Sequence, residues 1–185
     1  MAEKIKTVAV YCGHQFGNDP QFEKDARAVG EMLAKQGYRM VFGGGDVGLM
    51  GTVASAALDN GGEVIGISTD DVLAKQEPAH PEIEVVVVDG VNERKQRMFE
   101  LSDAFIILPG GIGTLNELTD ILTMQQIGET QKPVFFYDSG EFWDPLAKLI
   151  HHMGECGFIE CFCEYITHNA ETIQELETQL KQYKD

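Results

Sequence analysis

Short apolar runs alternate with amphipathic stretches from one end of this 185-residue chain to the other. An alternation of this kind is typical of parallel strands joined by crossover helices. It predicts strands over residues 7–12, 38–42, 63–67, 83–88, 103–108 and 133–137. It also predicts helices over residues 19–36, 47–60, 91–101, 114–127, 143–154 and 170–182. We therefore expect an α/β fold with a mostly parallel sheet, whose ligand crevice lies at the carboxyl ends of the strands.

The size and charge of the chain exclude several classes of function. Its length predicts one domain, residues 1–185, with room for a core that needs no disulfide or metal. The formal net charge of −16 repels nucleic acids and anionic membranes, so we expect neither as a partner. No apolar run is long enough to span a bilayer, and the start lacks a signal-peptide pattern, so we expect a cytoplasmic protein.

Cysteine and histidine spacing gives no sign of a metal site. The four cysteines form no C-x-x-C pair, and the adjacent His151 and His152 point to different faces of a predicted helix. We therefore expect no metal. The long connection from Thr69 to Pro81 has no clear periodicity, and loops of that length within a compact domain are often functional.

A glycine-rich turn follows the second predicted strand. Residues 43–48 match the dinucleotide pattern G-x-G-x-x-G. However, that fingerprint normally follows the first strand, and Glu63, at the position of the ribose-binding acid, begins a strand. A second interpretation is that the glycines serve only a tight strand-to-helix turn.

A second turn, Pro109-Gly110-Gly111-Ile112-Gly113-Thr114, follows the predicted strand at 103–108. Proline ends the strand, and the glycines allow close approach of a ligand to the backbone. A helix that begins near Thr114 directs its free N–H groups and its positive dipole end toward that ligand. This turn predicts a seat for a phosphate group.

Glu117 and Arg94 are the candidate reactive pair beside that seat. Thr114-x-x-Glu117 also fits a capping box, in which the glutamate only caps the helix. Arg97 has Glu93 four residues before it, whereas Arg94 has no such partner and needs an external anion or carboxylate. A carboxylate, a guanidinium and a phosphate seat in one crevice fit hydrolysis at a phosphorylated sugar, whose transition state is oxocarbenium-like.

Several motifs together resemble one family. Glu93-Arg94-Lys95 and Pro109–Glu117 resemble the E/Q-R-K and PGGxGTxxE motifs of the LONELY GUY (LOG) family, and the likeness extends over nearly the whole chain. Members of that family are cytokinin riboside 5′-monophosphate phosphoribohydrolases, often mislabelled as lysine decarboxylases. Decarboxylation of lysine needs a pyridoxal phosphate anchored on a lysine, for which a chain of 185 residues leaves little room.

The resemblance implies a Rossmann-like, doubly wound fold and a homodimer whose partner contributes to the pocket. It implies that Arg94 and Glu117 are catalytic and that a nucleoside 5′-monophosphate is hydrolysed to free base and ribose 5-phosphate without any cofactor. The implied substrate-binding residues are Gly44, Gly45, Glu77, Lys95, Gly110, Gly111, Gly113, Thr114 and Thr123.

The chain departs from the family pattern at a few positions. His14-Gln15 replaces the usual Ser-Ser pair, Asn116 replaces an acid, and Met124 replaces a tryptophan. His14 either donates to a phosphate oxygen or is only a polar loop residue. These departures keep a second function open: a non-catalytic carrier of a phosphorylated nucleotide or a pterin-type cofactor, similar to molybdenum cofactor carriers.

Overall fold

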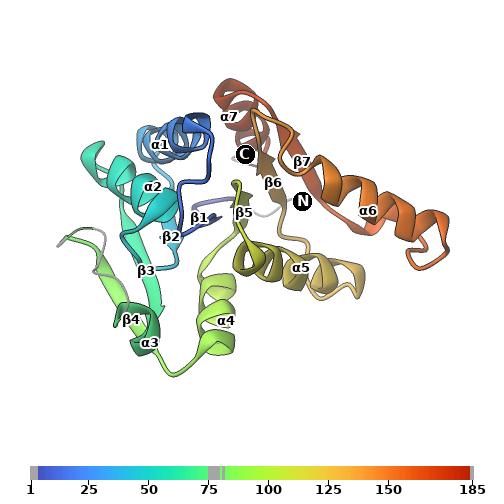
Figure 1. Ribbon diagram of the computed structural model, residues 1–185, viewed down its shortest axis with the longest axis horizontal. Helices are drawn as coiled ribbons and strands as arrows, with labels where there is room; N and C mark the ends of the chain where they lie inside the picture. The colour runs from blue at the N-terminus through green and yellow to red at the C-terminus, as the bar shows by residue number, and fades with distance from the viewer. Residues whose placement is uncertain (1–3, 75–79, 81, 184–185) are drawn as a thin grey trace.

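A computed structural model describes residues 4–74, 80 and 82–183 of the chain. Its strands form one sheet in the order β4-β3-β2-β1-β5-β6-β7, and every neighbouring pair is parallel (Figure 1). The strands are β1 (Thr7–Tyr11), β2 (Arg39–Phe42), β3 (Val64–Thr69), β4 (Glu84–Val88), β5 (Ala104–Ile107), β6 (Val134–Tyr137) and β7 (Thr167–Ala170). The helices are α1 (Pro20–Lys35), α2 (Gly48–Asp59), α3 (Asp70–Leu73), α4 (Val91–Leu101), α5 (Ile112–Gln126), α6 (Asp144–Glu155), the 3₁₀ turn η1 (Phe162–Glu164) and α7 (Ile173–Lys181).

The predicted α/β class, the doubly wound parallel sheet and all six predicted strands are confirmed. Three elements were not predicted, one of which is the 3₁₀ turn η1. The long connection after β3 contains the short helix α3, and the sequence THNA pairs with β6 as the edge strand β7. As a result, the last helix begins at Ile173, not at residue 170, after a capping box between Thr172 and Glu175.

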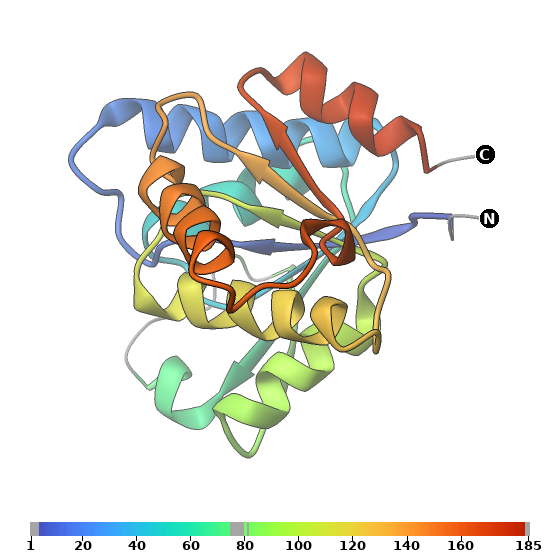
Figure 2. The ribbon, with the colours of Figure 1, turned by 90° about the vertical axis from the view of Figure 1, so that its right-hand side faces the viewer.

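Helices cover both faces of the sheet and bury two clusters of apolar side chains. Helices α1, α2 and α7 contribute to one cluster, and α4 and α5 contribute to the other. Figure 2 shows α1 and α7 on one side of the strands and α4 and α5 on the opposite side. Strand β5 is buried along its whole length, which explains the continuous apolar run that predicted it.

Local sequence signals explain the start and the close packing of α1. The side chain of Asp19 accepts a hydrogen bond from the Gln21 amide at 2.8 Å, and Pro20 occupies the first turn. Gly30 lets α1 approach α2, because a Cβ there would lie 2.3 Å from the Val53 carbonyl oxygen. This packing holds α2, and with it the glycine turn that precedes α2, firmly against the sheet.

The order of the strands reverses at β1. The chain builds β2, β3 and β4 on one side of β1 and then returns to place β5, β6 and β7 on the other. In doubly wound folds the ligand crevice lies at such a switch point, beyond the carboxyl ends of the strands. Here that point lies between the segments that follow β1 and β5. Within the described residues, no helix has the length and apolar character needed to cross a bilayer.

Candidate active site

The turn between β5 and α5 forms an open helix N-terminus at the switch point. Gly111 is the N-cap of α5, and no side chain of the described residues caps the helix. A Cβ at Gly111 or Gly113 would meet no described atom within 4 Å, so the space before the helix is open. The N–H groups of the first turn lack helical partners and carry the positive end of the helix dipole. The turn therefore has the geometry of the predicted phosphate seat.

Gly110 and Thr114 close the inner side of this seat. A Cβ at Gly110 would lie 2.2 Å from the Thr114 hydroxyl oxygen and 3.0 Å from the Gly13 nitrogen. Thr114 itself is buried. Gly110 is therefore needed for packing against α5 and against the segment after β1.

Three loops meet at this edge of the sheet. The Gly13 amide donates to the Pro109 carbonyl at 3.0 Å, and the Met50 amide donates to the Gly13 carbonyl at 3.2 Å. A Cβ at Gly48 would lie 2.3 Å from the carbonyl carbon of His14, so this glycine allows the loops after β1 and β2 to touch. His14 is exposed, and both interpretations of it stay open.

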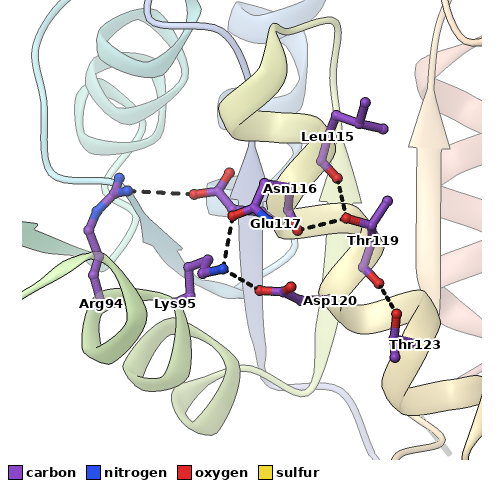
Figure 3. A network of polar contacts seen from close by, with 8 residues as sticks. All are labelled: Arg94, Lys95, Leu115, Asn116, Glu117, Thr119, Asp120 and Thr123. Atoms are coloured by element: carbon purple, nitrogen blue, oxygen red, sulfur yellow. Dashed lines mark hydrogen bonds and ion pairs between the residues drawn. The ribbon is translucent and has the colours of Figure 1, made fainter.

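Arg94 and Glu117 come together beside the open N-terminus of α5, as Figure 3 shows. The guanidinium Nη1 lies 3.6 Å from the carboxylate Oε1, and the two side chains are 14% and 12% exposed. The unpaired arginine of the sequence therefore finds a carboxylate of its own chain, on the next helix. Glu117 is one helical turn after Thr114, about 4.5 Å further along the helix axis.

The capping-box interpretation of Thr114 and Glu117 is wrong. Helix α5 begins at Ile112, two residues earlier than predicted, and its N-cap is Gly111. Thr114 therefore lies inside the first turn of the helix, and the carboxylate of Glu117 pairs with Arg94. A glycine N-cap has no side chain, so the true start left no polar signal in the sequence.

Burial changes the protonation of Glu117. The pKa of its carboxyl group rises from 4.5 to about 7 because desolvation outweighs the attraction of Arg94 and Lys95, and Asp120 adds a small rise. Glu117 can therefore hold or release a proton near neutral pH. Desolvation, reinforced by the nearby Glu117 carboxylate, also raises the pKa of Tyr11, which keeps that phenol neutral.

A cavity of about 320 Å³ lies between α4 and α5 and includes Glu117. Its walls come from Tyr11 of β1, from Asn92, Lys95, Gln96 and Phe99 of α4, and from Glu117, Asp120, Ile121 and Met124 of α5. Sequence reasoning proposed only Glu117 and Lys95 from this set as site residues. The helical spacing i, i+3, i+4, i+7 within each helix was the available signal.

Lys95 bridges the two helices at the cavity. Its ammonium donates to the Asn116 side-chain oxygen at 2.8 Å and lies 2.6 Å from the Asp120 carboxylate (Figure 3). The position where the family has an acid thus supplies a neutral acceptor for Lys95. Thr123, in contrast, is exposed, and its hydroxyl donates to the Thr119 carbonyl at 2.7 Å. It does not line the cavity, and its binding role stays a prediction.

The remaining predicted site residues lie at the turn after β2 and in the long connection. Gly44 and Gly45 are buried. Gly44 has a φ of 78°, and a Cβ there would lie 3.0 Å from the Cβ of Ser68. The conformation of the turn is thus sufficient to explain Gly44. Glu77 lies outside the described residues. Among the residues described, no group of three or more His, Cys, Asp or Glu side chains is placed to hold a metal ion.

Solved structures with low sequence identity share this fold. A molybdenum cofactor binding protein from Rippkaea orientalis is 22% identical, with a TM-score of 0.69 and 98% of both chains covered. A molybdenum cofactor carrier protein from Chlamydomonas reinhardtii is 18% identical, with the same TM-score and coverage. At these identities the likeness extends to the fold alone.

Sequence relatives identify the family more closely. Residues 50–180 match the protein family described as possible lysine decarboxylase. The cytokinin riboside 5′-monophosphate phosphoribohydrolase LOG of Oryza sativa subsp. japonica is 37% identical over 180 residues, which are 97% of this chain and 74% of that protein. The cytokinin riboside 5′-monophosphate phosphoribohydrolase of Rhodococcoides fascians is 41% identical over 155 residues, 83% of this chain and 78% of that protein. This chain belongs to the LONELY GUY (LOG) family.

Proposed function

We propose that this protein hydrolyses the N-glycosidic bond of a purine nucleoside 5′-monophosphate. Water and the nucleotide give the free base and ribose 5-phosphate, and the base is of the cytokinin type or adenine. The observation that carries the proposal is the partly buried Arg94–Glu117 pair, 3.6 Å apart and beside an uncapped helix N-terminus. The family relatives, named as phosphoribohydrolases at 37% and 41% identity, support the same reaction.

The phosphate of the nucleotide binds at the start of α5. The amides of the first turn, at Ile112, Gly113 and Thr114, supply the hydrogen bonds, and the helix dipole favours the negative charge. Gly111 and Gly113 leave the space that the phosphate oxygens need, since a Cβ at either would point into open space. This seat fixes one end of the substrate, so the sugar extends toward Glu117.

Glu117 acts on the sugar carbon from which the base departs. As the C–N bond breaks, positive charge develops on the ribose, and an ionised carboxylate stabilises it or orients the attacking water. The nearby Arg94 guanidinium favours the ionised form against the desolvation that raises the pKa of Glu117. Activity should therefore rise with pH through about 7 as Glu117 loses its proton.

The proposal is tested by incubating the protein with AMP and with isopentenyl-AMP and measuring released base by chromatography. Equal amounts of base and ribose 5-phosphate are expected, and release by Glu117→Gln should be slower on the order of 10²–10³-fold. Nucleotide binding by calorimetry without any base release, by the parent protein, would instead support the alternative function as a carrier of a phosphorylated ligand. Release of carbon dioxide from lysine would point to the chemistry in the family's description.

Assembly as a homodimer belongs to the same proposal. The family resemblance implies it, and several large apolar side chains at the far end of the fold are exposed, among them Leu149, Met153, Phe158 and Phe162. Light scattering at micromolar concentration measures the mass directly. A fully active monomer would show that the pocket needs no partner.

The expected cytoplasmic location also stays a prediction.

A further inference from the structure

Two backbone carbonyls, one in β3 and one directly after β2, hold the guanidinium of Arg94. Its Nε donates to the Ile67 carbonyl at 2.8 Å, in β3, and its Nη2 donates to the Gly43 carbonyl at 3.1 Å, directly after β2. Only Nη1 faces Glu117. Because the guanidinium is planar, two hydrogen bonds to different nitrogens fix its plane and its direction. These two carbonyls, at the end of the sheet, thus fix the direction in which the Arg94 guanidinium points.

The space at Gly43 is shaped by this side chain. A Cβ there would lie 2.0 Å from Nη2 and 3.3 Å from Cζ of Arg94, and 2.7 Å from Sδ of Met50. Gly43 does not have the positive φ that its neighbour Gly44 has, so its backbone conformation does not itself favour glycine. The need for glycine at this position therefore comes from the neighbouring side chains, and above all from the guanidinium.

We propose that Gly43 is a positioning residue: its carbonyl and the Ile67 carbonyl hold the Arg94 guanidinium so that Nη1 faces Glu117. The first glycine turn therefore serves the reaction through the arginine and not only through contact with the nucleotide. The catalytic part of this inference rests on the proposed function, whereas the placement of the guanidinium against Glu117 does not.

Holding Arg94 through backbone carbonyls has an electrostatic consequence. Carbonyl groups hold the guanidinium without neutralising it, so its full charge remains available to Glu117 and to a bound anion. The charged groups around Glu117 are Arg94 and Lys95 on α4 and Asp120 on α5. The phenol of Tyr11 on β1 and the thiol of Cys12 directly after it also lie close enough to feel its charge. Displacing the guanidinium removes the nearest positive charge and leaves Glu117 easier to protonate.

The test is Gly43→Ala, with Gly90→Ala as the matched control. Gly90 is the N-cap of the helix that carries Arg94 and has an extended φ of −170°, and a Cβ there would meet no described atom within 4 Å. A carbon-detected NMR titration of the Glu117 carboxyl group is expected to show a higher pKa in Gly43→Ala and no change in Gly90→Ala. For hydrolysis, kcat/KM is expected to fall about 100-fold in Gly43→Ala, in line with misplacing a catalytic group by about 1 Å.

A double-mutant cycle separates positioning from general damage. Lysine has no group at the place of Nη2, so in an Arg94→Lys background the change Gly43→Ala is expected to add less than a twofold further loss. An equal loss in both backgrounds would overturn the proposal. So would an unchanged Glu117 titration in a folded Gly43→Ala protein.

The contact with Met50 is controlled by a second variant. The double variant Gly43→Ala with Met50→Ala removes the clash of the new methyl group with Met50 and keeps its clash with Arg94. It also keeps the proposal testable if Gly43→Ala alone does not fold. The loss of activity and the shift in the Glu117 titration are expected to persist. Recovery of both would show that Gly43 serves only packing against Met50. A parent protein without hydrolase activity would refute the proposed function, and the titration would still decide the role of Gly43.

Discussion

Replacing Glu117 by glutamine should make the protein more stable and less active at the same time. The change keeps the size of the side chain and removes its negative charge. In the folded protein the pKa of Glu117 is about 7, against 4.5 for an ordinary glutamate. Between these two values the folded state binds more protons than the unfolded chain, so stability falls as pH rises. Above about pH 7 Glu117 is ionised in both states, and the folded state then bears the full desolvation cost of its charge.

The pKa difference gives the size of this effect. One pKa unit corresponds to 1.36 kcal/mol, so the parent loses about 3 kcal/mol of stability between pH 4.5 and pH 8 through this group. Glutamine does not titrate, and the remaining groups titrate in both proteins. Glu117→Gln should therefore match the parent near pH 4.5 and exceed its free energy of unfolding by about 3 kcal/mol at pH 8.

Urea unfolding at pH 5, 6, 7 and 8, followed by circular dichroism, measures this difference. Glu100→Gln is the control, because Glu100 is exposed, and both its ion pair with Arg97 at 3.6 Å and its hydrogen bond from Gln96 at 2.9 Å lie at the surface. It should change stability by less than about 0.5 kcal/mol. Base release by Glu117→Gln should fall on the order of 10²–10³-fold, with nucleotide affinity within a few-fold of the parent. A pH-independent difference in stability, or a variant that keeps its activity, would refute the reasoning.

Three further predictions test the surroundings of the pair. Gly110→Ala should lower Tm by ~5 °C, because the new methyl group would clash with Thr114 in the first turn of α5. Gly113→Ala should leave Tm unchanged and raise KM about tenfold, because its methyl group would enter the space proposed for the phosphate. Asp120→Asn should move the acid limb of the kcat/KM profile to lower pH, because its negative charge raises the pKa of Glu117. Asp25→Ala should cost about 1–3 kcal/mol in urea unfolding, with activity unchanged, since this buried carboxylate accepts hydrogen bonds from the side chains of Gln21, Ser139 and Tyr137.

The strands were predictable because most of them are buried between helices. Strand β5 has the sequence AFII and is covered on both faces, so its buried position requires the continuous apolar run that predicted it. Strand β7 reads THNA and lies at the edge of the sheet, where backbone pairing with β6 places it. Main-chain hydrogen bonds leave no pattern in the side chains. An edge strand of polar residues therefore could not be recognised from the sequence.

The start of α5 shows a different limit. A glycine N-cap offers no polar side chain, and Thr114 with Glu117 resembles a capping box whose N-cap would lie three residues after the true one, Gly111. The N-cap at Gly111 and the ion-pair partner of Glu117 decide between the two interpretations, and that partner lies on another helix. Lys95 is similar, since its bonds to Asn116 and Asp120 depend on which faces of α4 and α5 meet.

The topology explains why Arg94 and Glu117 could be predicted as a pair and why Gly43 could not be assigned to them. In a doubly wound sheet every crossover helix begins at the carboxyl edge of the strands. Arg94 is in the first turn of α4 and Glu117 is in the second turn of α5, and α4 and α5 flank β5 in the chain, so both side chains must lie near one edge. Gly43 reaches Arg94 across 51 residues, through a carbonyl group and through the absence of a Cβ. Neither property distinguishes it from any other glycine in a turn, so its role emerges only when the guanidinium is in place.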